Sequence, residues 1–233
     1  MGCYDVIVVG GGHAGCEAAL AAARLGCKTL LASMDSKALG RMSCNPSIGG
    51  IAKSHLVFEL DALGGEMARN TDHTGIQFRV LNTRKGPAVR SNRAQCDRTA
   101  YCARMVATIS ATPDLTVIAA LVSSIWTEHG QLRGIVTQDG SQIGGKTVIL
   151  TAGTFLRGTI HIGANSVPGG RDGEPSAEDL SKSLLSLGFR LGRLKTGTPP
   201  RLYARSIAFD RMQIQPGIVP PPFFSRRAGR CRR

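Results

Sequence analysis

A glycine-rich loop near the start of the chain constrains the fold most strongly. The segment VIVVGGGHAGCEAALAAARLG places Gly10, Gly12 and Gly15 in a G-x-G-x-x-G pattern between a β-branched run, residues 4–9, and an alanine-rich run, residues 14–25. In dinucleotide-binding proteins these glycines allow the tight turn, the close approach of a pyrophosphate and the packing of helix against strand. The pattern predicts an α/β, Rossmann-like domain with a dinucleotide at the N-terminus of its first helix.

The remaining sequence continues the α/β pattern. Short β-type runs predict strands at 28–32, 76–81, 115–119, 122–126, 134–137 and 147–150, and longer runs predict helices at 52–63 and 94–110. Ser176 to Asp179 resemble a capping box that would start a helix running to Leu187. Residues 82–95 have the composition of a loop, and the chain loses its periodicity from Gln213 onward, which is unlike a folded domain.

The end of the second predicted strand lacks the acidic residue that often binds the ribose of NAD. Ala32, Ser33 and Met34 stand there, and Asp35 lies slightly further on. This sequence weakens the case for NAD as the bound dinucleotide.

Cysteine usage and hydropathy indicate a cytoplasmic globular protein. Hydrophobic residues make up 42% of the 233, yet no apolar run reaches the roughly 18 residues that a membrane span requires. The seven cysteines are odd in number and form no C-x-x-C pair. We therefore expect reduced thiols, no metal site and no membrane segment.

The strong positive charge points to a polyanionic partner. Lys and Arg number 29 against 16 Asp and Glu, which gives a formal net charge of +13. Nucleic acid is the first candidate. Two basic groups could follow phosphates: Arg79, Arg84, Lys85, Arg90, Arg93, Arg98 and Arg104, and then Arg190, Arg193, Lys195 and Arg201.

Several longer motifs carry a family resemblance. GGGHAG, SCNPSIGGIAK, DALGG, GIQFRVLNTRKGPAVRSNRAQ, VILTAGTFLRGTIHIG and GRLKTGTPPR together resemble the FAD-dependent tRNA uridine 5-carboxymethylaminomethyl modification enzymes, the MnmG or GidA family. The resemblance implies a truncated flavoprotein with two dinucleotide-binding domains. Residues 1–200 would be the first segment of the FAD-binding domain, 201–222 the start of an inserted NADH-binding domain, and 223–233 a basic tail unlike the family, as after a frameshift.

The same resemblance implies the site residues. Cys44, in the SCNP loop, would be catalytic, and a cation such as Lys53 and the following helix would favour its thiolate. The residues implied for FAD are Gly10, Gly11, Gly12, His13, Ala14 and Gly15 on the pyrophosphate, Val122 near the adenine and Ser176 at a later flavin contact. The segment 151–155, TAGTF, resembles the strand end that returns to the cofactor.

The function implied is modification of the wobble uridine of tRNA at C5. The family uses FAD, takes NADH and methylenetetrahydrofolate as co-substrates, works with an MnmE-type GTPase and forms homodimers. Two other functions stay open on the sequence: another FAD-dependent oxidoreductase, or a non-enzymatic basic fragment that binds nucleic acid.

Overall fold

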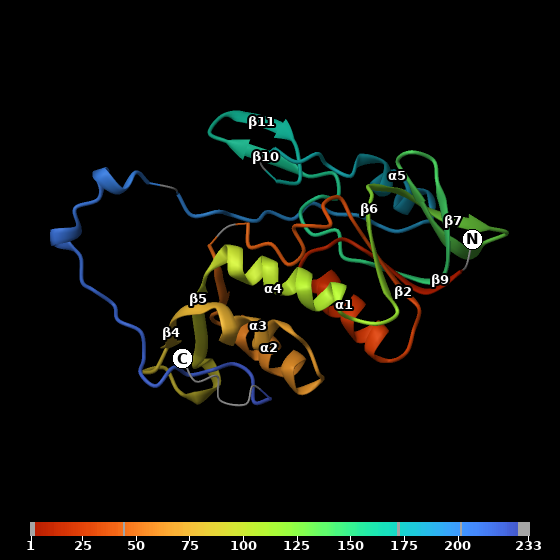
Figure 1. Ribbon diagram of the computed structural model, residues 1–233. Coiled ribbons are helices and arrows are strands. Elements are labelled where there is room, and N and C mark those ends of the chain that lie inside the picture. The colour runs from red at the N-terminus through yellow and green to blue at the C-terminus, as the bar shows by residue number, and fades with distance from the viewer. Residues whose placement is uncertain (1–2, 44, 172, 201, 228–233) are drawn as a thin grey trace. The chain divides into compact units, whose positions relative to one another are not determined.

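The computed structural model describes residues 3–43, 45–171, 173–200 and 202–227, which form two compact units (Figure 1). Unit 1 comprises Met1–Arg41 and Cys102–Gly192, and unit 2 comprises Met42–Tyr101 and Arg193–Arg233. Each unit therefore joins segments that are distant in the sequence. The division into 1–200, 201–222 and 223–233 stays a prediction.

Unit 1 is built on a six-stranded sheet in the order β6-β2-β1-β9-β8-β7. Its strands are β1 (Tyr4–Val9), β2 (Thr29–Ser33), β6 (Leu115–Ala119), β7 (Val122–Glu128), β8 (Gln131–Thr137) and β9 (Gln142–Leu150). The first four in sheet order are parallel, and β8 and β7 are antiparallel to their neighbours. Ile7 and Leu30 in the central strands are almost fully buried, as continuous apolar runs in parallel strands predict. The α/β, Rossmann-like fold is confirmed.

Three helices and a hairpin complete unit 1. Helix α1 (His13–Arg24) packs against β1 and β2 and ends before Gly26, and residues 102–110 of α4 (Arg98–Ser110) also belong to this unit. Helix α5 (Glu178–Ser186) packs on β7, and β10 (Thr159–Ile162) pairs with β11 (Asn165–Pro168). The predicted capping box is wrong, because Ala177 is the N-cap residue and the Ser176 hydroxyl donates to the Glu178 carboxylate at 2.6 Å.

Unit 2 contains a three-stranded antiparallel sheet in the order β3-β5-β4. Its strands are β3 (Ser47–Gly49), β4 (Gly75–Leu81) and β5 (Ser91–Cys96); its helices are α2 (Lys53–Ala62) and α3 (Met67–Thr74), with short 3-10 turns η1 (Pro87–Val89), η2 (Ala204–Ser206) and η3 (Phe209–Arg211). Among the helices of the described ranges, not one is long and apolar enough to cross a membrane.

Two elements of unit 2 correct the sequence prediction. The expected loop at 82–95 includes β5, which pairs with β4 along its whole length. The helix expected from Ala94 begins only at Arg98, because the Asp97 carboxylate accepts the amides of Thr99 and Ala100 at 2.9 Å and so starts the helix there.

The segment after Gln213 is also more ordered than its sequence predicts. Phe224 is only 1% exposed and stacks on Phe58 with ring centroids 5.4 Å apart. The amides of Phe224 and Ser225 donate to the Asp72 carboxylate at 2.8 and 2.7 Å. The expectation of an unfolded close to the chain is therefore wrong as far as residue 227.

Candidate cofactor site

The predicted glycine loop forms the turn from β1 into α1, and two of its glycines are required by packing. Gly10 has φ +110°, and its amide donates to the carbonyl of Ala32 at 2.8 Å. A side chain at Gly10 would overlap the Thr151 backbone, and one at Gly15 would overlap the Gly10 carbonyl. Only glycine fits at these two positions, which fixes the path of the loop.

Gly12 has the opposite surroundings. It is exposed, its φ of −72° suits any residue, and a Cβ built there would meet nothing within 4 Å. Gly12 is also the N-cap residue of α1, and no described side chain caps the helix there. The loop thus presents an open backbone at a helix N-terminus with its partial positive charge, as a pyrophosphate requires. The glycine positions fit a dinucleotide.

Residues 151–157 link the glycine loop to Ser176. The Thr151 hydroxyl donates to the carbonyls of Val9 and Gly10 at 2.9 and 3.0 Å. At the other end, the Ala177 amide donates to the Phe155 carbonyl at 2.7 Å. Ser176, which is half-buried and directly precedes Ala177, therefore lies next to the segment that contacts the loop.

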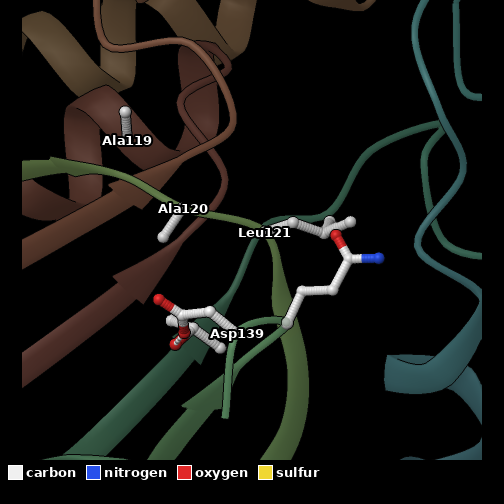
Figure 2. A pocket seen from close by; sticks show the side chains of 6 residues that line it. Ala119, Ala120, Leu121 and Asp139 are labelled. Carbon is white, nitrogen blue, oxygen red and sulfur yellow. Dashed lines mark hydrogen bonds between the residues drawn. The ribbon is translucent and has the colours of Figure 1, made fainter. Parts of the chain in front are cut away.

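Val122 lies beside a cavity but does not point into solvent. Its side chain is 3% exposed and belongs to the core of unit 1, so only its backbone could face a ligand. The adjoining cavity of about 390 Å³ lies where β6 ends (Figure 2). It is lined by Ala119, Ala120, Leu121, Thr137, Gln138 and Asp139.

The lining residues also meet the end of β2. The Ala120 amide donates to the Ser33 carbonyl at 2.8 Å, so the cavity adjoins the strand end where NAD-binding domains often carry a ribose-binding acid. Sequence reasoning missed this cavity, and its small, uncharged Ala119 and Ala120 gave no chemical signal.

His13 and Ala14 begin α1 directly after Gly12. The His13 side chain is half-buried, and burial lowers the pKa of its imidazole, so the ring is neutral near pH 7. Ala14 is exposed and places only a methyl group at the helix start.

Cys44, predicted to be catalytic, lies outside the described residues. The neighbouring chain is held in place: the Ser47 amide donates to the Asn45 carbonyl and the Cys96 amide to the Pro46 carbonyl, both at 2.7 Å. Lys53 is exposed at the start of α2. No group of three or more His, Cys, Asp or Glu side chains within the described part of the chain could hold a metal ion.

Two other cysteines are packing residues. Cys16 and Cys96 are buried, and burial raises the pKa of their thiols to about 12 and about 11. A thiol with so high a pKa is almost entirely protonated at neutral pH and is a poor nucleophile.

Sequence comparison matches residues 5–231 to the family described as glucose inhibited division protein A. The tRNA uridine 5-carboxymethylaminomethyl modification enzymes MnmG of Geotalea uraniireducens and Syntrophotalea carbinolica are 58% and 56% identical over 222 residues. Each match covers 95% of this chain and 36% of the relative, so the chain spans about a third of their length.

Solved structures give the same result. GidA of Aquifex aeolicus, in two crystal forms, superposes with TM-scores of 0.90 and 0.91 at 49% identity, over 96% of this chain and 37% of that one. The GidA-related protein of Thermus thermophilus, at 23% identity and a TM-score of 0.60, shares the fold over 81% of this chain and 70% of its own. By fold and by sequence, this chain belongs to the GidA (glucose inhibited division protein A) family.

Proposed function

We propose that this chain is part of a FAD-dependent enzyme that modifies the wobble uridine of tRNA at C5. The observation that carries the proposal is the glycine loop. Neighbouring backbone leaves no room for a side chain at Gly10 or Gly15, whereas the space beside Gly12 is free of protein atoms. The named relatives, tRNA uridine 5-carboxymethylaminomethyl modification enzymes, supply the reaction class. The chain spans 36% of their length, so the activity is proposed for the whole protein.

The residues of unit 1 would bind and orient FAD. The backbone from Gly10 to Gly15 would hold the pyrophosphate, including Gly11, His13 and Ala14, with the neutral imidazole adding no charge. The Val122 backbone, beside the cavity at 119–121, would lie near the adenine, and Ser176 would make a later contact. When bound, FAD supplies redox chemistry that no side chain can perform.

Cys44 is the proposed nucleophile. A thiolate attacks an electron-poor carbon far better than a hydroxyl does, and a cation close to the thiol, for which we propose Lys53, would favour the ionised form. With Cys16 and Cys96 buried and protonated, these two are poor competitors for the role. We further propose NADH and methylenetetrahydrofolate as co-substrates, an MnmE-type GTPase and a second copy of the protein as partners, and the cytoplasm as the location.

Flavin binding by the chain tests the site. Gly12→Val adds a side chain that meets no protein atom but occupies the space where a phosphate would approach. We expect it to lower flavin affinity by roughly tenfold or more, because the loss of close backbone contacts with a charged group removes at least about 1.5 kcal/mol.

A matched control distinguishes an effect at the glycine loop from a general effect of replacing a glycine by valine. Gly192→Val makes the same change at another glycine of unit 1 with nothing within 4 Å, and it should bind FAD like the unmodified chain. Binding is measured by flavin fluorescence quenching, with circular dichroism to verify the fold. Equal affinity of Gly12→Val and Gly192→Val would remove the glycine loop from the cofactor site.

A further inference from the structure

Two arginines lie directly opposite each other on neighbouring strands of unit 2. The antiparallel register pairs Arg79 of β4 with Arg93 of β5, and Gly49 of β3 is the partner on the other side of Arg93. Paired residues in an antiparallel sheet project from the same face. The two side chains therefore share one face, and β3 places no side chain beside them.

No acidic residue balances this pair locally. Residues 75–96 include Arg79, Arg84, Lys85, Arg90 and Arg93 but no Asp or Glu. Among the ion pairs of the described residues, none involves Arg79 or Arg93. The excess positive charge on this strand pair has no protein counterpart in the described structure.

Both guanidinium groups are held by neutral oxygens. Arg79 donates to the Gln215 side-chain oxygen at 3.0 Å, and Arg93 donates to the Ser47 hydroxyl at 3.5 Å. A guanidinium group has five N–H donors, so each arginine is oriented by one contact and keeps further donors for a ligand.

The arrangement opposes sheet stability. Like charges directly opposite each other destabilise a sheet, and both arginines are half-buried, where water screens them less. Two positions further along the same strands, uncharged residues lie opposite one another: Gln95 of β5 pairs with Gln77 of β4 and with Ser47 of β3. Local rules of this kind are broken mainly at functional sites, and two paired cations suit an anionic ligand.

We propose that Arg79 and Arg93 together bind one phosphodiester group of the RNA substrate. Two planar guanidinium groups on one face can donate in pairs to the oxygens of a phosphate, a geometry that lysine cannot supply. This inference rests on the proposed function, which makes tRNA the substrate. It assigns these two residues to substrate binding and not to chemistry.

The test compares two double variants that each remove two positive charges. Arg79→Gln/Arg93→Gln removes the proposed contacts. Arg133→Gln/Lys182→Gln removes cations of unit 1 that already pair with Glu128 at 3.3 Å and Asp179 at 2.8 Å. Binding of a fluorescent tRNA anticodon stem–loop is measured by anisotropy across a salt series.

We expect the Arg79/Arg93 variant to bind roughly 10- to 100-fold more weakly, because two charge-assisted contacts are lost. The slope of log affinity against log salt should fall by about 0.7, the value for one neutralised phosphate on a single strand. The control variant should bind within about twofold of the unmodified chain, with an unchanged slope.

Thermal unfolding separates binding from folding. Removing the repulsion should leave the melting temperature of the Arg79/Arg93 variant equal or higher while RNA binding weakens. A lower melting temperature together with weaker binding would make the arginines structural and overturn the inference. Unchanged binding and slope would overturn it and leave the proposed function intact. Failure of the unmodified chain to bind the RNA, with flavin still bound, would contradict tRNA as the substrate and the inference with it.

Discussion

Phe224 should be one of the main stabilising residues of unit 2, although it lies in a segment without periodicity. Its side chain is 1% exposed and stacks on Phe58. Truncating a fully buried phenylalanine to alanine removes its transfer free energy and leaves a cavity, which together cost about 3–5 kcal/mol. For a chain of this size, Phe224→Ala should lower the melting temperature by roughly 6–20 °C.

The neighbouring residue provides the control. Phe223 contacts Phe78 edge to face at 5.6 Å but is 40% exposed, so Phe223→Ala should cost only about 1–2 kcal/mol. Thermal unfolding followed by circular dichroism gives the melting temperature of each variant. Hydrogen exchange of β5 locates the loss in unit 2, whereas Trp126 on β7 reports on unit 1.

Equal melting temperatures for Phe224→Ala and Phe223→Ala would refute this reasoning. So would a loss of exchange protection confined to unit 1. Either result would mean that residues 224–227 do not contribute to the core of unit 2.

Two further predictions concern ionisable groups. Burial raises the pKa of the Asp61 carboxyl, but hydrogen bonds from Ser225, Arg226 and Arg227 outweigh burial, so the pKa is lowered overall. The ionised Asp61 carboxylate therefore stabilises the folded chain near neutral pH, and this stabilisation is lost as the pH falls below about 4. Asp61→Asn should therefore be less stable at pH 7, with a difference that narrows in acid denaturation curves; a constant difference would count against the pairing. In thiol labelling at pH 8, exposed Cys3 should react fast and buried Cys16 and Cys96 only on unfolding, which mass spectrometry can verify. Fast labelling of Cys16 in the folded chain would contradict its burial.

The elements that the sequence predicted well are those with a local cause. The turn at Gly10–Gly15 follows from residues within it, and β1 and α1 on either side carry clear apolar patterns. Helix α2 was expected at 52–63 and spans Lys53–Ala62, because Gly64, with φ +98°, ends it.

The missed elements of unit 2 have polar or small buried residues. The buried positions of β5 are Ser91, Ala94 and Cys96, whose small or polar side chains and uneven spacing give no hydrophobic alternation. Helix α3 buries Asn70 and Asp72, and such residues are stable inside only when hydrogen-bonded. The Asn70 amide donates to the Tyr101 carbonyl at 2.9 Å, a partner that no local pattern reveals.

The candidate site was predictable in part for the same reason. Glycine spacing located the loop, whereas only the family resemblance pointed to residues 151–155, which were expected to return to the cofactor; Thr151 contacts the loop at Val9 and Gly10. The cavity next to Val122 was missed because it is formed by residues at the ends of β6 and β8, and local sequence patterns do not reveal which strand ends lie together.

The carboxylates of α2 and α3 show why unit 2 needs segments from both parts of the sequence. Asp61 and Asp72 are each only 3% exposed, and burying a carboxylate without donors would cost several kcal/mol. Asp72 accepts the amides of Phe224 and Ser225, while Asp61 accepts the Ser225 hydroxyl at 2.8 Å and the Arg227 guanidinium at 3.0 Å. These donors all come from four consecutive residues, so the packing of α2 and α3 depends on a segment more than 150 positions away.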